Sequence, residues 1–165
     1  MEPETLYTEK VSSKWTQALF VMLTLLFLLL AVWRTFARGR FTGWAIAFAC
    51  FSAMFLFYAI NFRTLIIRIA KTGVHLTFGI FHWKVPFDNI EFCALDNAIP
   101  WGLKYGGAGV HFMSVRKRYR VSFNVLEYER VVIGLRQKAG LVRDVSFSTR
   151  HPTEILRVVN ERLTE

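Results

Sequence analysis

Residues 15–33 read WTQALFVMLTLLFLLLAVW and residues 43–62 read GWAIAFACFSAMFLFYAINF, and neither stretch contains a charged residue. With a rise of about 1.5 Å per residue, a helix of either length crosses a hydrocarbon core about 30 Å thick. Trp15 and Trp33 close the ends of the first stretch, as aromatic belts do. The first stretch is too long for a secretory signal peptide, and a second apolar stretch follows it. The sequence therefore predicts two transmembrane helices, 15–33 and 43–62.

The short connection between the two stretches predicts an antiparallel helical hairpin. Only residues 34–42 join them. Ala45, Ala49 and Ala53 recur every four residues in the second stretch. Small residues at this spacing let helix backbones approach closely in lipid. We therefore expect the alanines to pack on the first helix.

The positive charges beside the spans predict the orientation of the hairpin. The connection carries three arginines, and the other ends of the spans carry five basic residues: Lys10, Lys14, Arg63, Arg68 and Lys71. Cytoplasmic segments carry an excess of Lys and Arg. We therefore expect a multi-pass protein of the cell membrane with both termini, and the domain that follows the spans, in the cytoplasm.

After the hairpin the pattern changes to that of a β domain, residues 63–165. Short runs rich in Val, Ile, Phe and Thr alternate with turn residues, which is typical of successive antiparallel strands. Eight strands are predicted, at 64–70, 74–78, 80–87, 90–96, 110–116, 119–125, 130–136 and 141–148. Pro152 then opens an amphipathic helix, 152–163. Residues 1–14 are assigned to an N-terminal tail.

This arrangement predicts a mainly-β domain, a two-sheet sandwich or barrel closed by one C-terminal helix. A five-stranded oligonucleotide/oligosaccharide-binding barrel is the alternative fold. It has fewer strands than the sequence indicates, and it usually lacks such a closing helix.

The charge of the chain suggests an anionic partner. The formal net charge is +9, and most of the excess lies after residue 62. Basic surfaces bind anionic lipid headgroups, acidic proteins or nucleic acids. Because the domain is expected to be tied to a bilayer, we expect membrane lipid or a membrane-protein partner and no nucleic acid.

The basic run Arg116, Lys117, Arg118, Tyr119 and Arg120 is the first candidate binding surface. It spans a predicted hairpin, so its charges would gather at one tip, and an aromatic ring beside cations suits a lipid interface. The alternative is a solvated turn that keeps the domain soluble.

Trp101 and Tyr105, in the glycine-rich segment 97–109, are the second candidate. Aromatic residues in such a loop can form a recognition surface or enter the membrane interface. They can equally fold back over one end of the core.

The sequence contains no recognisable catalytic, cofactor or metal motif. The histidines, His75, His82, His111 and His151, do not stand at metal-ligand spacings. Asp96 with Glu91 is interpreted as surface charge rather than as an acid–base pair. The segment 105–109, YGGAG, lacks the lysine and following helix of a phosphate-binding loop. We therefore expect a protein that is not an enzyme and uses no cofactor.

Several stretches together resemble a known family. They are the hairpin followed at once by a strand, and the segments GVHLTFGIFHWKVPFDNI (73–90), YGGAGVHF (105–112) and VVIGLRQKAGLVRDVSFSTRHPTEIL (131–156). The chain resembles the small bacterial and archaeal membrane proteins that carry a bacterial pleckstrin-homology-like domain after two transmembrane helices. Many of these have no assigned activity. The resemblance implies a platform that binds lipids or proteins.

The leading hypothesis is a membrane-anchored, non-enzymatic binding or scaffolding module. An alternative is a subunit or assembly factor of a larger membrane complex, and self-association through the helices is a further possibility. Phosphoinositide-binding members of the wider fold carry several basic residues in the first strand-to-strand loop. Here that loop, residues 71–73, contains a single lysine, so the resemblance does not imply specific inositol-phosphate binding.

Overall fold

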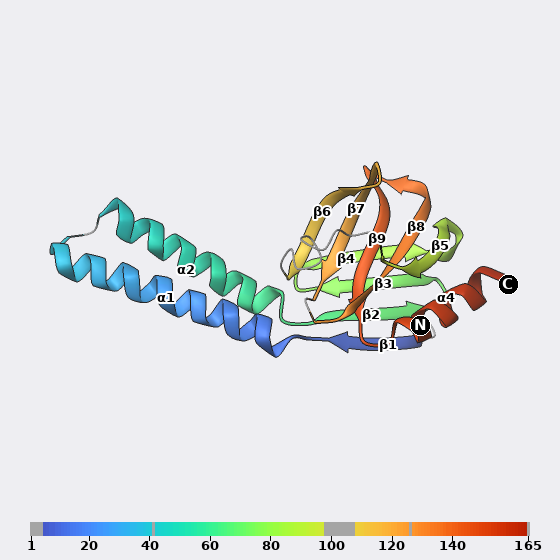
Figure 1. Cartoon of the computed structure of the whole chain (residues 1–165), viewed down its shortest axis with the longest axis horizontal. Helices are drawn as coiled ribbons and strands as arrows, with labels where there is room; N and C mark the ends of the chain where they lie inside the picture. The colour runs from blue at the N-terminus through green and yellow to red at the C-terminus, as the bar shows by residue number, and fades with distance from the viewer. Residues whose placement is uncertain (1–4, 41, 98–107, 126, 165) are drawn as a thin grey trace. The chain divides into compact units, whose positions relative to one another are not determined.

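The computed structural model describes residues 5–40, 42–97, 108–125 and 127–164 (Figure 1). The chain divides into two compact units. One is helical and comprises Lys14–Arg63. The other comprises Met1–Ser13 and Thr64–Glu165, so its strands come from both sides of the helices in the sequence.

Two long helices make up the helical unit, α1 (Lys14–Arg38) and α2 (Gly43–Asn61). Both are long and apolar enough to cross a membrane. The first continues to Arg38, five residues beyond the predicted span, and ends where Gly39 adopts a positive φ of 61°. The second begins at an N-cap, because the Thr42 hydroxyl accepts a hydrogen bond from the Ala45 amide.

The contact between α1 and α2 follows a seven-residue repeat. The small side chains of Ala45, Ser52 and Ala59 are buried on α2. The Ser52 hydroxyl donates to the Thr24 carbonyl oxygen of α1 at 3.0 Å, and the Phe27 ring of α1 lies among three phenylalanine rings of α2. A seven-residue spacing keeps side chains on one face of a helix.

The predicted packing of Ala49 and Ala53 on the first helix is wrong. Ala45 is buried, but Ala49 and Ala53 are exposed on the hairpin. At about 100° per residue, each step of four residues turns the side chain by about 40° around the helix. The alanine row therefore leaves the face that meets α1, and Ser52 takes its place.

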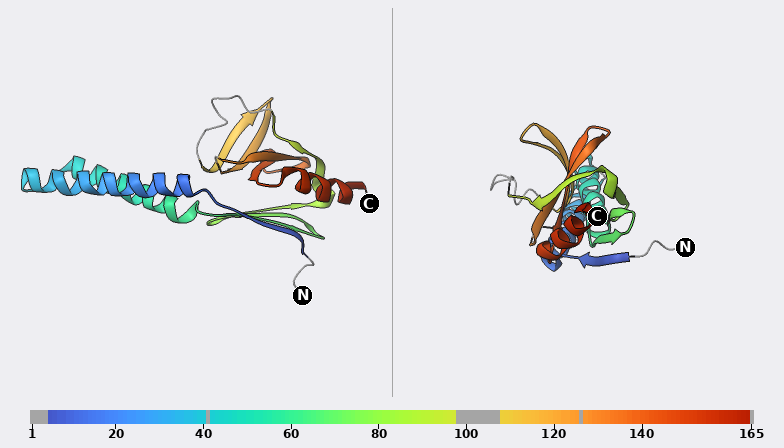
Figure 2. Two further views of the ribbon diagram at one scale, coloured as in Figure 1. Left: turned by 60° about the horizontal axis from the view of Figure 1, so that its bottom comes forward. Right: turned by 90° about the vertical axis from the view of Figure 1, so that its right-hand side faces the viewer.

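Two sheets form the layers of the β unit (Figure 2). The first is antiparallel, in the order β1 (Thr5–Val11), β2 (Leu65–Ala70), β3 (Gly73–Phe78) and β4 (Phe81–Pro86). A short 3-10 helix, Phe87–Asn89, follows. The second sheet has the order β5 (Ile90–Leu95), β8 (Glu129–Ala139), β9 (Val142–Thr149), β7 (Arg118–Asn124) and β6 (Gly109–Val115). Its β7–β9 pair is parallel.

The core lies between the sheets and is completed by the C-terminal helix α4 (Pro152–Thr164). That helix packs against β5 and β8 and buries Ile155 and Val159. The apolar face of each sheet is almost fully buried: Leu65, Ile67, Ile69, Val74, Leu76 and Phe78 in the first sheet, and Val121, Phe123, Val131, Ile133, Val145 and Phe147 in the second. The predicted class, a helical hairpin with a two-sheet β domain and one C-terminal helix, is confirmed. Within the described residues neither sheet closes into a barrel.

The predicted N-terminal tail contains a strand. Residues 5–11 form β1, which pairs along β2 from Val11 opposite Leu65 to Thr5 opposite Ala70. The strand was missed because its inward positions include a carboxylate, Glu9, which hides the apolar alternation. The Glu9 side chain is only 7% exposed. It accepts hydrogen bonds from the Thr149 hydroxyl (2.6 Å), the Tyr7 hydroxyl (3.0 Å) and the Arg150 amide (2.8 Å).

Candidate functional site

The basic hairpin of the sequence analysis is the turn between β6 and β7. Arg116 and Lys117 form its two central positions, and both have positive φ, 50° and 63°. Such two-residue turns match the twist of paired strands. Arg116, Lys117 and Tyr119 are exposed, Arg118 is half-buried and Arg120 is buried. The five candidate residues therefore do not form one surface. The other candidates, Trp101 and Tyr105, lie outside the described residues.

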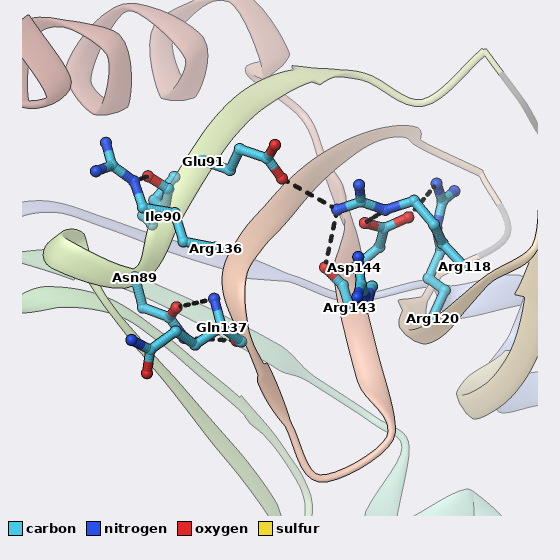
Figure 3. Close-up of polar contacts among 9 residues, drawn as sticks. All are labelled: Asn89, Ile90, Glu91, Arg118, Arg120, Arg136, Gln137, Arg143 and Asp144. Atoms are coloured by element: carbon cyan, nitrogen blue, oxygen red, sulfur yellow. Dashed lines mark hydrogen bonds and ion pairs between the residues drawn. The ribbon is translucent and has the colours of Figure 1, made fainter.

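Arg118 lies on the outer face of the five-stranded sheet, where it joins two carboxylates (Figure 3). Its Nε donates to Asp144 Oδ1 at 2.7 Å, and its Nη2 donates to Glu91 Oε2 at 3.3 Å. Burial lowers the pKa of Arg118, but the hydrogen bonds and charges of Asp144 and Glu91 outweigh burial and raise it. The guanidinium also lies 5.6 Å from the centre of the Phe92 ring.

Arg120 joins the same network at greater depth. Its Nη1 donates to Asp96 Oδ1 at 2.7 Å, and its Nη2 donates to Asp144 Oδ2 at 3.3 Å. Asp96 directly follows β5, whereas Arg120 lies on β7, with β8 and β9 between them in the sheet. The pair therefore crosses the face of the sheet. Arg130 of β8 is also buried. Burial lowers the pKa of Arg130. The negative charge of Asp96 raises this pKa, and the positive charge of Arg120 lowers it.

A pocket of about 240 Å³ lies over this network. Arg116, Arg118 and Arg120 line it together with Asp96 and Asp144, and its apolar lining includes Phe92, Ala94, Val115 and Val132. The expectation that Asp96 is a surface carboxylate is wrong, since its side chain is fully buried. Glu91, by contrast, is exposed.

The outer face of the four-stranded sheet is basic. Alternation along the strands puts one set of side chains on this face: Lys10, Arg68, His75, His82 and Lys84. Arg68 is opposite His75, which is opposite Lys84. Glu9 is the only acidic residue in strands β1–β4 as described, and it lies on the inner face. We call these five residues the basic sheet face.

His75 lies at the centre of the basic sheet face. Its Nε2 is buried and has no hydrogen-bond partner among the described residues. Burial lowers the pKa of His75, and the charges of Lys84 and Arg68 lower it further. Its neighbour His82 shares a hydrogen bond with the Thr77 hydroxyl through Nδ1 at 3.2 Å.

Sequence reasoning missed both the ion-pair network and the basic sheet face. A signal for the network was present, because β7 alternates polar and apolar residues, with Arg118, Arg120, Ser122 and Asn124 on one face. The same alternation places Asp144, Ser146 and Ser148 beside them on β9. Two polar rows on adjacent strands indicate a polar sheet face. The pairing of β7 with β9 could not be derived locally.

Comparison with known proteins gave no match to a family model, to a curated protein or to a solved structure. In the part of the chain that the structure describes, no three His, Cys, Asp or Glu side chains come together as metal ligands.

Proposed function

We propose that this chain is a membrane-anchored, non-enzymatic binding module whose basic sheet face contacts anionic lipid headgroups. The observation that carries this proposal is a sheet face with five basic or titratable nitrogen groups and no carboxylate among its described residues. An ordinary soluble surface mixes charges of both signs. A single-sign face favours an anionic surface as its partner.

The hairpin supports the membrane half of the proposal. Its surface is apolar along its length, with Trp15, Leu29, Phe36 and Ile60 all more than 60% exposed. Contiguous apolar surface of this extent requires a hydrocarbon environment or a partner protein. The two helices have the length that a bilayer demands.

Chain connectivity supports the contact with headgroups. Two residues separate β1 from α1, and three residues separate α2 from β2. An extended residue spans at most about 3.5 Å. The adjacent ends of β1 and β2 are therefore tied closely to the ends of the helices, and Lys10 belongs to this tethered end. A tether raises the effective concentration of the face at the bilayer, so weak contacts suffice.

The charge on the basic sheet face is large enough to contribute to membrane binding. Each Lys or Arg close to an anionic membrane contributes about 1 kcal/mol. Lys10, Arg68 and Lys84 are exposed, so together they would contribute about 3 kcal/mol at low salt. We further propose that the β domain lies on the cytoplasmic side, as the charges beside the spans predict, because anionic lipids are concentrated in that leaflet.

A pleckstrin-homology-like fold is part of the same proposal. Two mainly antiparallel sheets and a C-terminal helix that covers one end of the core are compatible with it. The loop between β2 and β3 contains only one basic residue, Lys71. We therefore assign lipid contact to the basic sheet face and not to that loop.

Lysine footprinting of the full-length protein tests the proposal. The chain is reconstituted in nanodiscs of phosphatidylcholine, with or without phosphatidylglycerol, and acetylation of each lysine is followed by mass spectrometry. Lys10 and Lys84 should react several-fold more slowly in the anionic discs. Lys117, in the turn between β6 and β7, and Lys138, on β8, are exposed and serve as the internal controls. Equal rates at Lys10 and Lys84 in both discs, or protection confined to the controls, would contradict the proposal.

A further inference from the structure

The turn between β3 and β4 is an exposed apolar tip. It consists of Gly79 and Ile80, because Phe78 pairs with Phe81 across the turn. Gly79 has a positive φ of 60° and Ile80 does not, which is the pattern of a type II′ hairpin turn. The Ile80 side chain is 62% exposed, and that of Phe81 is 39% exposed. Two adjacent large apolar residues are therefore accessible at the tip.

Strand register places this tip at the end of the sheet that is joined to the helices. Val11 at the end of β1 and Phe78 at the end of β3 are both opposite Leu65, the first residue of β2. The arrow of β3 accordingly points to the end at which β2 begins (Figure 1). The chain leaves this end of β1 for α1 and arrives at this end of β2 from α2. The turn therefore projects beyond Leu65, on the side of both connections, and only three residues separate α2 from β2.

The turn at the opposite end of the same sheet is polar. Lys71 and Thr72 join β2 to β3 there, and both are exposed. The exposed side chains near the apolar tip include Lys10 and Arg63 beside the two connections and His82 directly after the turn. Segments that lie in a membrane interface combine apolar and basic side chains, because burial of apolar area and attraction to anionic lipid both contribute.

From this placement we infer that the β3–β4 turn is a membrane-interface anchor, in which Ile80 enters the boundary between headgroups and acyl chains. The inference rests on the membrane half of the proposed function, which is a hairpin embedded in the bilayer. It does not require anionic lipid, because the transfer of apolar surface out of water is favourable beside any headgroup. The tip provides a third attachment beside the two chain connections, and it fixes which end of the β unit is turned to the lipid.

The β8–β9 turn offers a matched control for the tip. Leu141 follows Gly140 in this turn, Gly140 has a positive φ of 63°, and Leu141 is 75% exposed. The turn lies at the other end of β9 from Arg150, whose guanidinium donates to the Ser12 carbonyl oxygen beside the connection to α1 at 3.5 Å. Leu141 therefore reproduces the local chemistry of Ile80 away from the connections, and the inference predicts no contact with lipid there.

Quenching of a fluorescent label tests the inference in the full-length protein. A thiol label is attached after Ile80→Cys or, as the control, after Leu141→Cys, with Cys50→Ala and Cys93→Ala removing the native thiols. The proteins are reconstituted in phosphatidylcholine nanodiscs, with or without bromine on the acyl chains. Quenching by bromine should be several-fold stronger at position 80 than at position 141, because a tip in the interface lies about 5–10 Å into the headgroup and acyl boundary.

A label on native Cys50, with only Cys93→Ala added, separates this inference from the proposed function. Cys50 is exposed on α2, so its label is quenched if the hairpin is embedded. Quenching at Cys50 without quenching at position 80, or equal quenching at positions 80 and 141, would overturn the inference alone. Absence of quenching at Cys50 would contradict the embedded hairpin and the inference together.

A second experiment separates the Ile80 side chain from the label. The label is moved to His82→Cys, and either Ile80→Ser or Leu141→Ser is added. Both changes replace an exposed aliphatic side chain in a turn, so the fold is retained. Ile80→Ser should reduce quenching of the label several-fold, whereas Leu141→Ser should leave it unchanged. The same quenching in both proteins would mean that Ile80 does not hold the tip in the lipid, contrary to the inference.

Discussion

At the scale of single residues, Glu9 couples the N-terminal strand to the rest of the β unit. Its two carboxylate oxygens accept hydrogen bonds from the Tyr7 hydroxyl on the same strand, and from the Thr149 hydroxyl and the Arg150 amide, which lie 140 and 141 residues away in the sequence. Burial raises the pKa of the Tyr7 hydroxyl, and the charge and hydrogen bond of Glu9 raise it further. Because three donors share the buried Glu9 carboxylate, β1 is held at the edge of the sheet more firmly than its apolar side chains alone would hold it.

Replacing Glu9 with alanine should destabilise the protein by about 2–4 kcal/mol, because the Thr149 hydroxyl and the Arg150 amide would lose their acceptor. Chemical unfolding of the full-length chain in micelles and hydrogen exchange of the β1 amides measure the effect. Glu161→Ala is the control, since its exposed pair with Arg157 contributes about 0–1 kcal/mol. Unchanged protection of β1 in the Glu9 variant would show that the carboxylate does not hold the strand.

His75 makes the stability of the β unit depend on pH. Its pKa is lowered in the folded protein by burial and by the charges of Lys84 and Arg68. The unfolded chain therefore takes up the proton first, and stability is lost as pH falls below about 6.5, the ordinary value of histidine. His75→Gln should flatten this part of the stability profile, measured by denaturant unfolding between neutral and mildly acidic pH. Identical slopes for the variant and the parent protein would contradict the assignment.

At the scale of elements, the α1–α2 contact depends on Ser52 and not on Ala49. Ser52→Leu should destabilise the hairpin by about 1–3 kcal/mol, because it overfills a buried position and removes the hydrogen bond to Thr24. Ala49→Leu should change stability by less than about 0.5 kcal/mol, since Ala49 is exposed. Thermal unfolding in detergent compares the two variants. Equal destabilisation by both would mean that α2 presents a different face to α1.

The exposed position of Ala49 also separates the two functional hypotheses. In a binding module anchored in lipid, a leucine at this position meets acyl chains and has no consequence. In a subunit of a larger membrane complex, the same leucine would disturb packing against another protein's helices. Loss of a co-purifying protein from Ala49→Leu, with hairpin stability unchanged, would favour the complex.

The elements were largely predictable from sequence, and their long-range arrangement was not. All eight predicted strands are present, since Val, Ile and Phe alternate with turn residues between them. The strand β1 was hidden by Glu9 at an inward position. The row Ala45, Ala49 and Ala53 drifts around the helix, so it does not stay on the face that meets α1. The network around Arg118 and Arg120 depends on β7 pairing with β9, and a parallel pairing between distant strands leaves no local signature.

At the scale of the whole molecule, charge is distributed differently over the two sheets. The outer face of the first sheet carries positive groups without carboxylates. On the second sheet, Arg118 and Arg120 are neutralised by Glu91, Asp96 and Asp144. The formal net charge of +9 therefore says less about binding than the location of the unpaired cations does. We assign the bilayer contact to the first sheet for this reason.

The account depends on the apolar hairpin being embedded in a bilayer. Alkaline carbonate extraction of membranes from cells that produce the full-length chain tests this most directly, because it releases proteins held only by surface charge. We predict that the protein stays in the sedimented membranes after carbonate and leaves them only with detergent. Recovery in the carbonate supernatant would show that Lys14–Arg63 does not span the membrane, and the proposed anchoring would be wrong.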